Sequence, residues 1–124
     1  MNSIIQWNIQ SYRTKFHELK LLLNQFSPLC VSLQETMIRT ANINPPSGYN
    51  ILHKPSDPDD GHERGVAILI SRNLHFEPVN LNTRLQAIAV KIISNKSYPI
   101  CSIYLPHQPT TKQEIQSLID QLPQ

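Results

Sequence analysis

Residues 4–34 contain two short apolar runs separated by one amphipathic segment, and this pattern limits the possible folds more than any other feature. Short apolar runs cover 4–9 and 29–34, and each reads as a strand. Between them, apolar residues recur at positions 16, 19, 22, 23 and 26, which places them on one face of a helix. Ser27-Pro28 ends that helix. A strand–helix–strand order favours two parallel strands joined by a right-handed crossover.

The remainder of the chain is richer in strands than in helices. Asn95-Lys96-Ser97 suits a tight turn, which makes its flanking strands antiparallel. Thr111-Lys112-Gln113-Glu114 fits a capping box at the start of a last helix. We therefore expect a sheet-rich α/β or α+β domain with its helices outside. The expected further strands cover residues 49–53, 65–70, 75–79, 85–93 and 98–105.

The composition indicates a globular domain without a strong charge signature. The 124 residues are 40% hydrophobic and 16% charged, with a formal net charge of +2. The basic residues are scattered, so the charge permits a nucleic-acid partner but does not require one. The sequence stops one residue after Pro123, just past a helix that needs a sheet to cover. We therefore expect the chain to be part of a larger domain.

The two cysteines and the lack of long apolar stretches bear on the cellular compartment. Cys30 and Cys101 both lie in apolar strand-like runs, which favours buried reduced thiols over a disulfide or a metal pair. No apolar stretch approaches the roughly 20 residues needed to cross a bilayer. The N-terminus also lacks a signal-like pattern. We expect a protein kept inside the cell, without a membrane partner.

Three short polar segments each follow an apolar run. They are Gln6-Trp7-Asn8, Gln34-Glu35-Thr36 and Tyr104-Leu105-Pro106. In α/β proteins, functional side chains gather at strand ends, where a rigid sheet directs them into a shared crevice. An amide, a carboxylate and a phenol gathered there suit a hard divalent cation and a phosphate.

Each candidate also has a plainer interpretation. Glu35 suits Mg²⁺, which takes one or two protein carboxylates and keeps several waters, but it also suits a solvated loop or a helix start. Asn8 can orient a phosphate or a carboxylate, or simply cap a turn. Tyr104 can donate its phenolic proton to a phosphate oxygen, or sit at the edge of the core. Taken singly, none of the three settles the function.

Other patterns carry less chemistry. The five histidines show no metal-ligand spacing, and no Gly-rich phosphate loop or Gly-x-Ser-x-Gly motif is present in the sequence. Gly65 is expected to begin a strand at a point where no side chain fits. A further acidic cluster lacks the spacing of a calcium loop and is expected to be a solvated loop. It comprises Asp57, Asp59, Asp60 and Glu63.

Taken in order, the motifs resemble the endonuclease/exonuclease/phosphatase superfamily of divalent-metal phosphodiesterases and phosphatases. Gln6-Trp7-Asn8-Ile9 resembles its first strand, and Leu33-Gln34-Glu35-Thr36 its second motif. Residues 65–70 resemble a core strand of the family. Ile103-Tyr104-Leu105-Pro106 resembles the motif whose tyrosine contacts the scissile phosphate. Within this superfamily, the motif sequences are most similar to the apurinic-type endonuclease domain of jockey-like non-LTR retrotransposon polyproteins.

This resemblance implies a fold, a cofactor and partners. Residues 1–124 would form the N-terminal half of a four-layer α/β/β/α sandwich of the DNase I-like fold. Glu35 and Asn8 would be metal ligands for Mg²⁺ or Mn²⁺, and Asn8 and Tyr104 catalytic residues. The implied activity is nicking of target DNA in the nucleus, next to a reverse transcriptase domain of the same polyprotein.

The sequence departs from the family in its later motifs. It has no Gly-Asp-Phe-Asn-like segment, whose Asp and Asn in the family position the attacking water and the phosphate. It also has no Ser-Asp-His-like segment, which supplies the family's Asp–His pair. Loss of a general base costs about 10²–10⁴-fold in rate, so we expect little turnover from this chain alone. Two alternatives stay open. One is a non-catalytic remnant or a nucleic-acid or protein-binding module of a transposable element. The other is a phosphoesterase of the superfamily that acts on a phosphoinositide or a sphingolipid.

Overall fold

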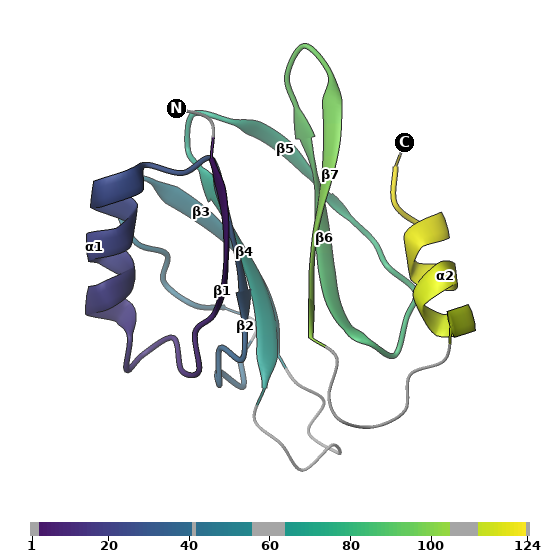
Figure 1. The fold of residues 1–124 in the computed structure, drawn as a ribbon, viewed down its shortest axis with the longest axis horizontal. Helices are drawn as coiled ribbons and strands as arrows, with labels where there is room; N and C mark the ends of the chain where they lie inside the picture. The colour runs from purple at the N-terminus through teal and green to yellow at the C-terminus, as the bar shows by residue number, and fades with distance from the viewer. Residues whose placement is uncertain (1–2, 41, 56–63, 105–111, 124) are drawn as a thin grey trace.

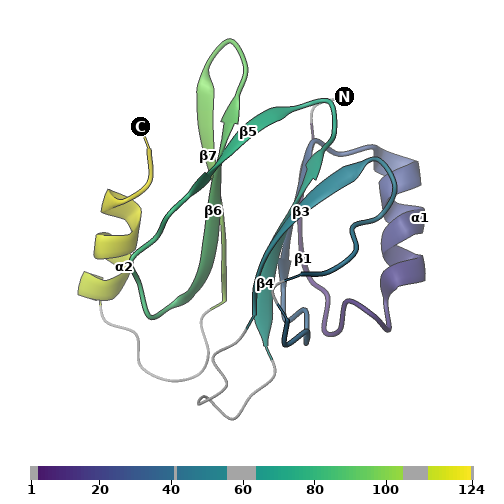
Figure 2. The same cartoon turned by 180° about the vertical axis from the view of Figure 1, so that it is seen from behind.

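Two β-sheets face each other, and one helix covers the outer face of each (Figure 1, and from behind in Figure 2). The computed structural model describes residues 3–40, 42–55, 64–104 and 112–123. Helix α1 (Phe16–Phe26) lies on the first sheet, and helix α2 (Lys112–Asp120) lies on the second. The layers therefore run α/β/β/α, which confirms the predicted mixed α/β class and the predicted order of layers.

The first sheet contains the strand–helix–strand unit. Its strands are β1 (Ile4–Asn8), β2 (Cys30–Gln34), β4 (Gly65–Ser71) and β3 (Tyr49–Pro55), in that spatial order. Strands β1 and β2 are parallel, and α1 connects them, as predicted. The other pairs are antiparallel. Ser27 caps the C-terminus of α1: its N–H donates to the Leu23 carbonyl at 2.9 Å, and its left-handed φ of 43° turns the chain out of the helix.

The second sheet is an antiparallel meander. It consists of β5 (His75–Val79), β6 (Gln86–Ile93) and β7 (Ser97–Tyr104). The tight connection between β6 and β7 confirms the predicted hairpin. Thr111, the first residue of the predicted capping box, lies outside the described residues, and α2 begins at Lys112.

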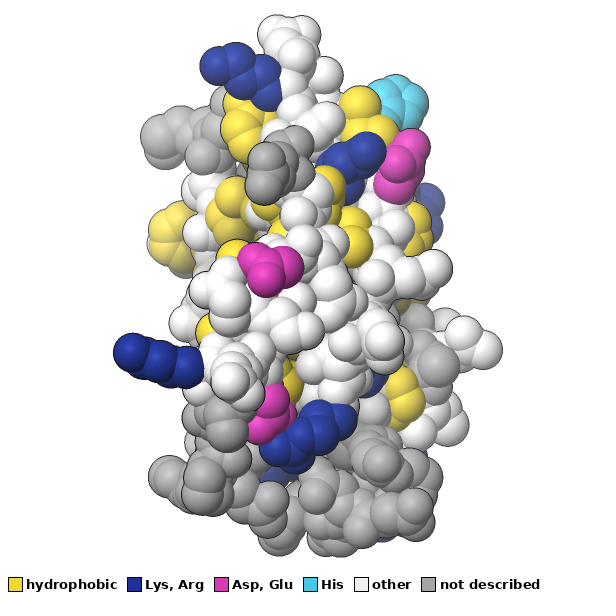
Figure 3. Space-filling view, turned by 90° about the vertical axis from the view of Figure 1, so that its right-hand side faces the viewer, with side chains coloured by type: hydrophobic (Ala, Val, Ile, Leu, Met, Phe, Trp, Pro, Cys, Tyr) yellow, Lys and Arg dark blue, Asp and Glu magenta, His cyan; other side chains and the backbone are white. Residues whose placement is uncertain are grey.

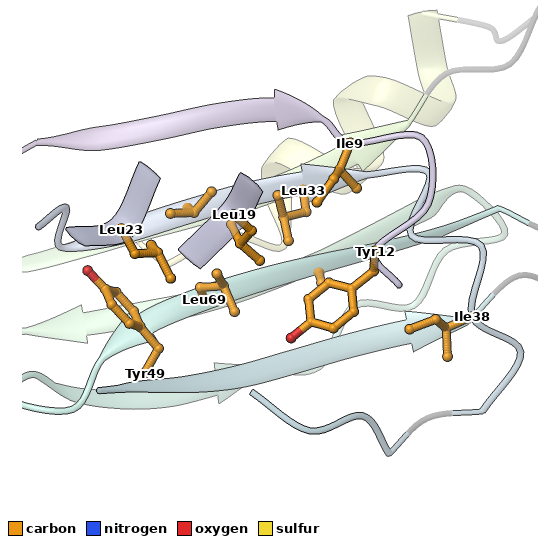
Figure 4. Packing of buried hydrophobic residues seen from close by; sticks show 10 residues of the cluster. Ile9, Tyr12, Leu19, Leu23, Leu33, Ile38, Tyr49 and Leu69 are labelled. Carbon is orange, nitrogen blue, oxygen red and sulfur yellow. The ribbon is translucent and has the colours of Figure 1, made fainter. Parts of the chain in front are cut away.

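Apolar side chains fill the space on both sides of the first sheet. Under α1, Leu19 and Leu23 pack against Leu33 and Leu69 (Figure 4). Between the sheets, a second cluster contains Cys30, Ile68, Ile70, Val90 and Ile92. Strand β2 is buried along its whole length because a helix covers one face and the second sheet the other.

Both cysteines are free thiols, as predicted. Cys30 lies within the core, where burial raises the pKa of its thiol to about 11. Cys101 is half-buried, and burial raises its thiol pKa too. Neither group is a reactive thiolate at neutral pH. Within the described part of the chain, no helix has the length and apolar content needed to span a bilayer.

The strand directions bring several chain segments to one edge of the sandwich. Strands β1, β2 and β7 end at the lower edge in Figure 1, and β4 begins there. Of the three polar segments singled out in the sequence, Gln6-Trp7-Asn8 forms the end of β1 and Gln34-Glu35-Thr36 begins with the last residue of β2. Tyr104 is the last residue of β7, and Leu105-Pro106 lie outside the described residues. This edge therefore holds the candidate site.

Candidate functional site

Glu35 follows β2 and is held in a strained backbone conformation. Its φ is 54°, in the left-handed region, which costs a non-glycine residue on the order of 1–2 kcal/mol. Backbone hydrogen bonds fix it from both sides. Its carbonyl accepts from the Ser11 N–H at 2.9 Å, and the next residue, Thr36, donates its N–H to the Gly65 carbonyl at 3.1 Å. Glu35 is 8% exposed, so its carboxylate is not the solvated loop group of the plainer interpretation.

Gly65 lets the start of β4 lie against this turn. Its φ is +132°, and a Cβ atom there would collide with Thr36 Oγ1 and stand 3.0 Å from His53 Nε2. Thr36 Oγ1 and His53 Nε2 share a hydrogen bond of 2.7 Å. The prediction that no side chain fits at Gly65 is confirmed, and the fit fixes the segment that carries Glu35.

Arg64 connects Glu35 with Tyr104. Its Nη1 donates to Glu35 Oε1 and to the Tyr104 hydroxyl oxygen, each at 2.7 Å. Its guanidinium carbon lies 4.9 Å from the centroid of the Tyr104 ring, within the range of a cation–π contact. Glu35 also lies near enough to the Tyr104 hydroxyl to raise its pKa. Two predicted site residues from different sheets thus meet in one hydrogen-bonded cluster.

The environment of Tyr104 keeps its phenol protonated. Burial raises the pKa of Tyr104 above its usual range, and the nearby Glu35 carboxylate raises it further. The positive charge of Arg64 opposes these effects but does not reverse them. The hydroxyl at this edge is therefore a proton donor for an acceptor oxygen at neutral pH.

Asn8 lies at the exposed end of β1 and faces the same space as Tyr104. It pairs in register with Gln34, the residue before Glu35. Asn8 and Tyr104 both line a cavity of about 380 Å³ between the two sheets. The structure therefore brings Asn8, Glu35 and Tyr104 to one edge, while their chemical roles stay predictions. The remaining lining residues are Gln6, Ser32, Gln34, Cys101 and Ile103.

A polar network along the wall of this cavity joins the two sheets. Gln34 Nε2 donates to Ser32 Oγ and to Ser102 Oγ, both at 3.0 Å. Gln34 Oε1 accepts from Gln6 Nε2. Ser102 Oγ donates in turn to the Leu33 carbonyl at 2.9 Å. This network joins β2 to β7 just before the positions of Glu35 and Tyr104.

The sequence interpretation missed two contributors to the site. In the sequence interpretation, Arg64 was only one of several scattered basic residues. Its position directly before the buried strand β4 could have indicated a charged side chain at the sheet edge. Gln34 counted only as part of a motif, although it is a polar side chain ending a fully buried strand. A polar residue at such a position needs a partner, and that need points to a network.

The donor set fits a cation that takes few protein ligands. Among residues 3–40, 42–55, 64–104 and 112–123, no three His, Cys, Asp or Glu side chains cluster as a metal site. One carboxylate and one amide nevertheless suit Mg²⁺, which keeps several of its waters. The placement of Arg64 shows that Glu35 is accessible to a positive group. The acidic segment of Asp57, Asp59, Asp60 and Glu63 lies outside the described residues.

A second cavity, of about 460 Å³, lies away from these three residues. It is lined by Tyr12, Arg13 and Phe16 on one side and by Ile38, Asn42, Ile43 and Asn44 on the other. The Tyr12 hydroxyl crosses it and donates to the Asn44 carbonyl at 2.7 Å. No sequence-predicted site residue contributes to this cavity, so its size alone does not make it the better candidate.

Comparison with known proteins identifies the fold. No family model matches the chain, and no curated protein matches its sequence. A solved AP endonuclease from Archaeoglobus fulgidus superposes with a TM-score of 0.53 at 23% identity, covering 74% of this chain and 37% of that one. The endonuclease domain of TRAS1, a telomere-specific non-LTR retrotransposon, superposes with a TM-score of 0.68 at 18% identity, covering 97% and 51%.

These likenesses confirm the predicted resemblance at the level of the fold. Over 97% of its length, this chain follows the backbone of a retrotransposon endonuclease domain. It spans about half the length of that solved structure and a smaller share of the archaeal one.

Proposed function

From a fold shared with an AP endonuclease and a retrotransposon endonuclease domain, we propose that this chain is the N-terminal half of a Mg²⁺-dependent DNA endonuclease domain. The reaction would be hydrolysis of a DNA phosphodiester. One observation supports it above the others: the ends of β1, β2 and β7 bring an amide, a carboxylate and a protonated phenol to one edge. These are the groups that suit a hard cation and a phosphate.

Each residue has a distinct task in this proposal. Glu35 and Asn8 hold Mg²⁺ or Mn²⁺ through carboxylate and amide oxygens. When bound, the metal stabilises negative charge that develops on the phosphate oxygens. Tyr104 donates its hydroxyl proton in a hydrogen bond to a phosphate oxygen, which its raised pKa keeps possible throughout the neutral range. The fixed backbone around Glu35 holds the carboxylate in place without reorganisation.

The attacking water needs residues beyond these three. The sequence has no Gly-Asp-Phe-Asn-like or Ser-Asp-His-like segment, and the chain spans about half of the retrotransposon endonuclease structure. We therefore assign the activation of water to a second half of the domain. The 124-residue chain alone is expected to show little or no turnover.

Target DNA is the proposed substrate, and it would approach the strand-end edge. On the face that carries α2, Lys and Arg side chains are interspersed with Asp and Glu, and the side chains coloured there form no large basic patch (Figure 3). A DNA backbone gains little from such a mixed surface. In the proposed element, the nick exposes a 3′ hydroxyl for a reverse transcriptase domain of the same polyprotein, and the protein acts in the nucleus.

A nicking assay on the full reading frame that contains this chain tests the proposal. Glu35→Gln should strongly reduce Mg²⁺-dependent nicking of supercoiled plasmid, because it removes the charged metal ligand. Glu77→Gln is the matched control, since Glu77 is exposed on β5 and pairs with Lys91 away from the site. Equal nicking by Glu35→Gln and Glu77→Gln would rule out the role given to Glu35.

A further inference from the structure

Arg64 pairs with the carboxylate that the proposed function assigns to the metal. Its guanidinium donates to the Glu35 carboxylate at 2.7 Å and contacts the ring of Tyr104. The Arg64 side chain is 27% exposed, and the Glu35 side chain is 10% exposed. The pair is thus shielded enough to be held firmly, yet one partner keeps a path to solvent.

We propose that Arg64 is a built-in counter-ion of Glu35 that a divalent cation must displace, so that Arg64 sets the metal affinity of the site. The proposal rests on the proposed function, because it takes Glu35 to be a metal ligand. It adds a residue that competes with the metal instead of binding it.

Competition follows from charge and space. Mg²⁺ binds carboxylate oxygens at about 2.1 Å and holds further waters around itself. A guanidinium hydrogen-bonded to Glu35 Oε1 fills part of that volume and repels a divalent charge. The guanidinium occupies Oε1 and its positive charge opposes a divalent cation at the same carboxylate, so in this proposal metal binding includes the cost of weakening or breaking the Arg64–Glu35 pair.

The contact with the Tyr104 ring can hold the Arg64 side chain after a metal displaces it from Glu35. The Arg64 guanidinium lies over the Tyr104 ring, and this contact does not need the Glu35 carboxylate. Arg64 directly precedes Gly65, the first residue of β4, so its backbone is joined to the sheet. A released Arg64 therefore remains at the edge of the site.

Mn²⁺ titration followed by electron paramagnetic resonance tests this inference on the 124-residue chain. Arg64→Gln should tighten Mn²⁺ binding by about tenfold, because a charge-assisted hydrogen bond to Glu35 no longer has to be broken. Arg72→Gln is the matched control: it removes the same charge next to the opposite end of β4. Its dissociation constant should stay within about twofold of the wild-type value. Arg64→Lys, which keeps the charge but loses the planar fork, should fall between wild type and Arg64→Gln.

The outcomes separate this inference from the proposed function. Equal Mn²⁺ affinities for Arg64→Gln, Arg72→Gln and wild type, all lost in Glu35→Gln, would overturn the competition and leave Glu35 as a ligand. Binding that survives Glu35→Gln, or no binding in any variant, would overturn both. Far-UV circular dichroism of each variant checks folding, and Arg64→Lys serves as the test if Arg64→Gln does not fold.

Discussion

The buried side chain of Gln34 is expected to join the two sheets at the site. It is 6% exposed, donates two hydrogen bonds, to Ser32 and Ser102, and accepts a third from Gln6. Gln34→Leu keeps nearly the same volume and removes all three bonds. The substitution therefore isolates the polar contribution of the network from its packing.

The cost can be worked from these contacts. Three hydrogen bonds at roughly 0.5–1.5 kcal/mol each give about 1.5–4.5 kcal/mol. The added apolar surface of leucine returns part of this, about 1 kcal/mol. Ser102 Oγ keeps its bond to the Leu33 carbonyl, so it is not left without a partner. We expect a net destabilisation of about 1–3 kcal/mol.

Urea unfolding followed by circular dichroism measures this cost. For a small domain, the loss shifts the midpoint by roughly 1 M urea. The control is Gln6→Leu at the exposed end of the same network, which removes one bond and should cost less than half as much. A Gln34→Leu midpoint that coincides with wild type, or with Gln6→Leu, would refute the claim that Gln34 joins the sheets.

Two further predictions concern the core and the pH range. Leu69→Ala, at a fully buried position on β4 under α1, should lower the free energy of unfolding by about 2–5 kcal/mol. Leu21→Ala, at a 56% exposed position, should change it by less than about 0.5 kcal/mol, and similar urea midpoints for the two variants would contradict this. Burial raises the pKa of Tyr12 from 10.0 to about 12, so the folded state retains a proton that the unfolded state loses in this window. Stability should therefore fall as pH rises from 10 to 12, and Tyr12→Phe should make this fall shallower in thermal melts at fixed pH; an unchanged slope would count against it.

Local patterns in the sequence predicted the elements well, for physical reasons. The period of the apolar residues in 16–26 identified α1, and the uninterrupted apolar run at 65–70 identified β4. Strand β4 reads as continuous because both of its faces are covered. The placement of Asn8 and Glu35 at one edge was also predictable, because the carboxyl ends of neighbouring parallel strands lie side by side, whereas the approach of Tyr104 depends on the second sheet.

The contacts that complete the site were not predictable from local patterns. Arg64 lies 29 positions from Glu35 and 40 from Tyr104 along the chain, and Gln34 lies 68 from Ser102. The Arg64–Glu35 pair depends on β2 and β4 being neighbours in the first sheet, and the other two pairs depend on how the two sheets pack. No periodicity or motif encodes either arrangement. The strained φ of Glu35 likewise arises from the neighbouring turn and from β4, not from the preferences of glutamate itself.

Paramagnetic broadening by Mn²⁺ tests the central claim most directly. NMR spectra of the chain, with labelled asparagine side chains and tyrosine rings, would be recorded as Mn²⁺ is added. The account predicts that the signals of the Asn8 amide and the Tyr104 ring broaden first, and that Glu35→Gln abolishes this effect. Broadening that begins elsewhere, or that persists at Asn8 and Tyr104 in Glu35→Gln, would contradict a shared cation site at the ends of β1, β2 and β7.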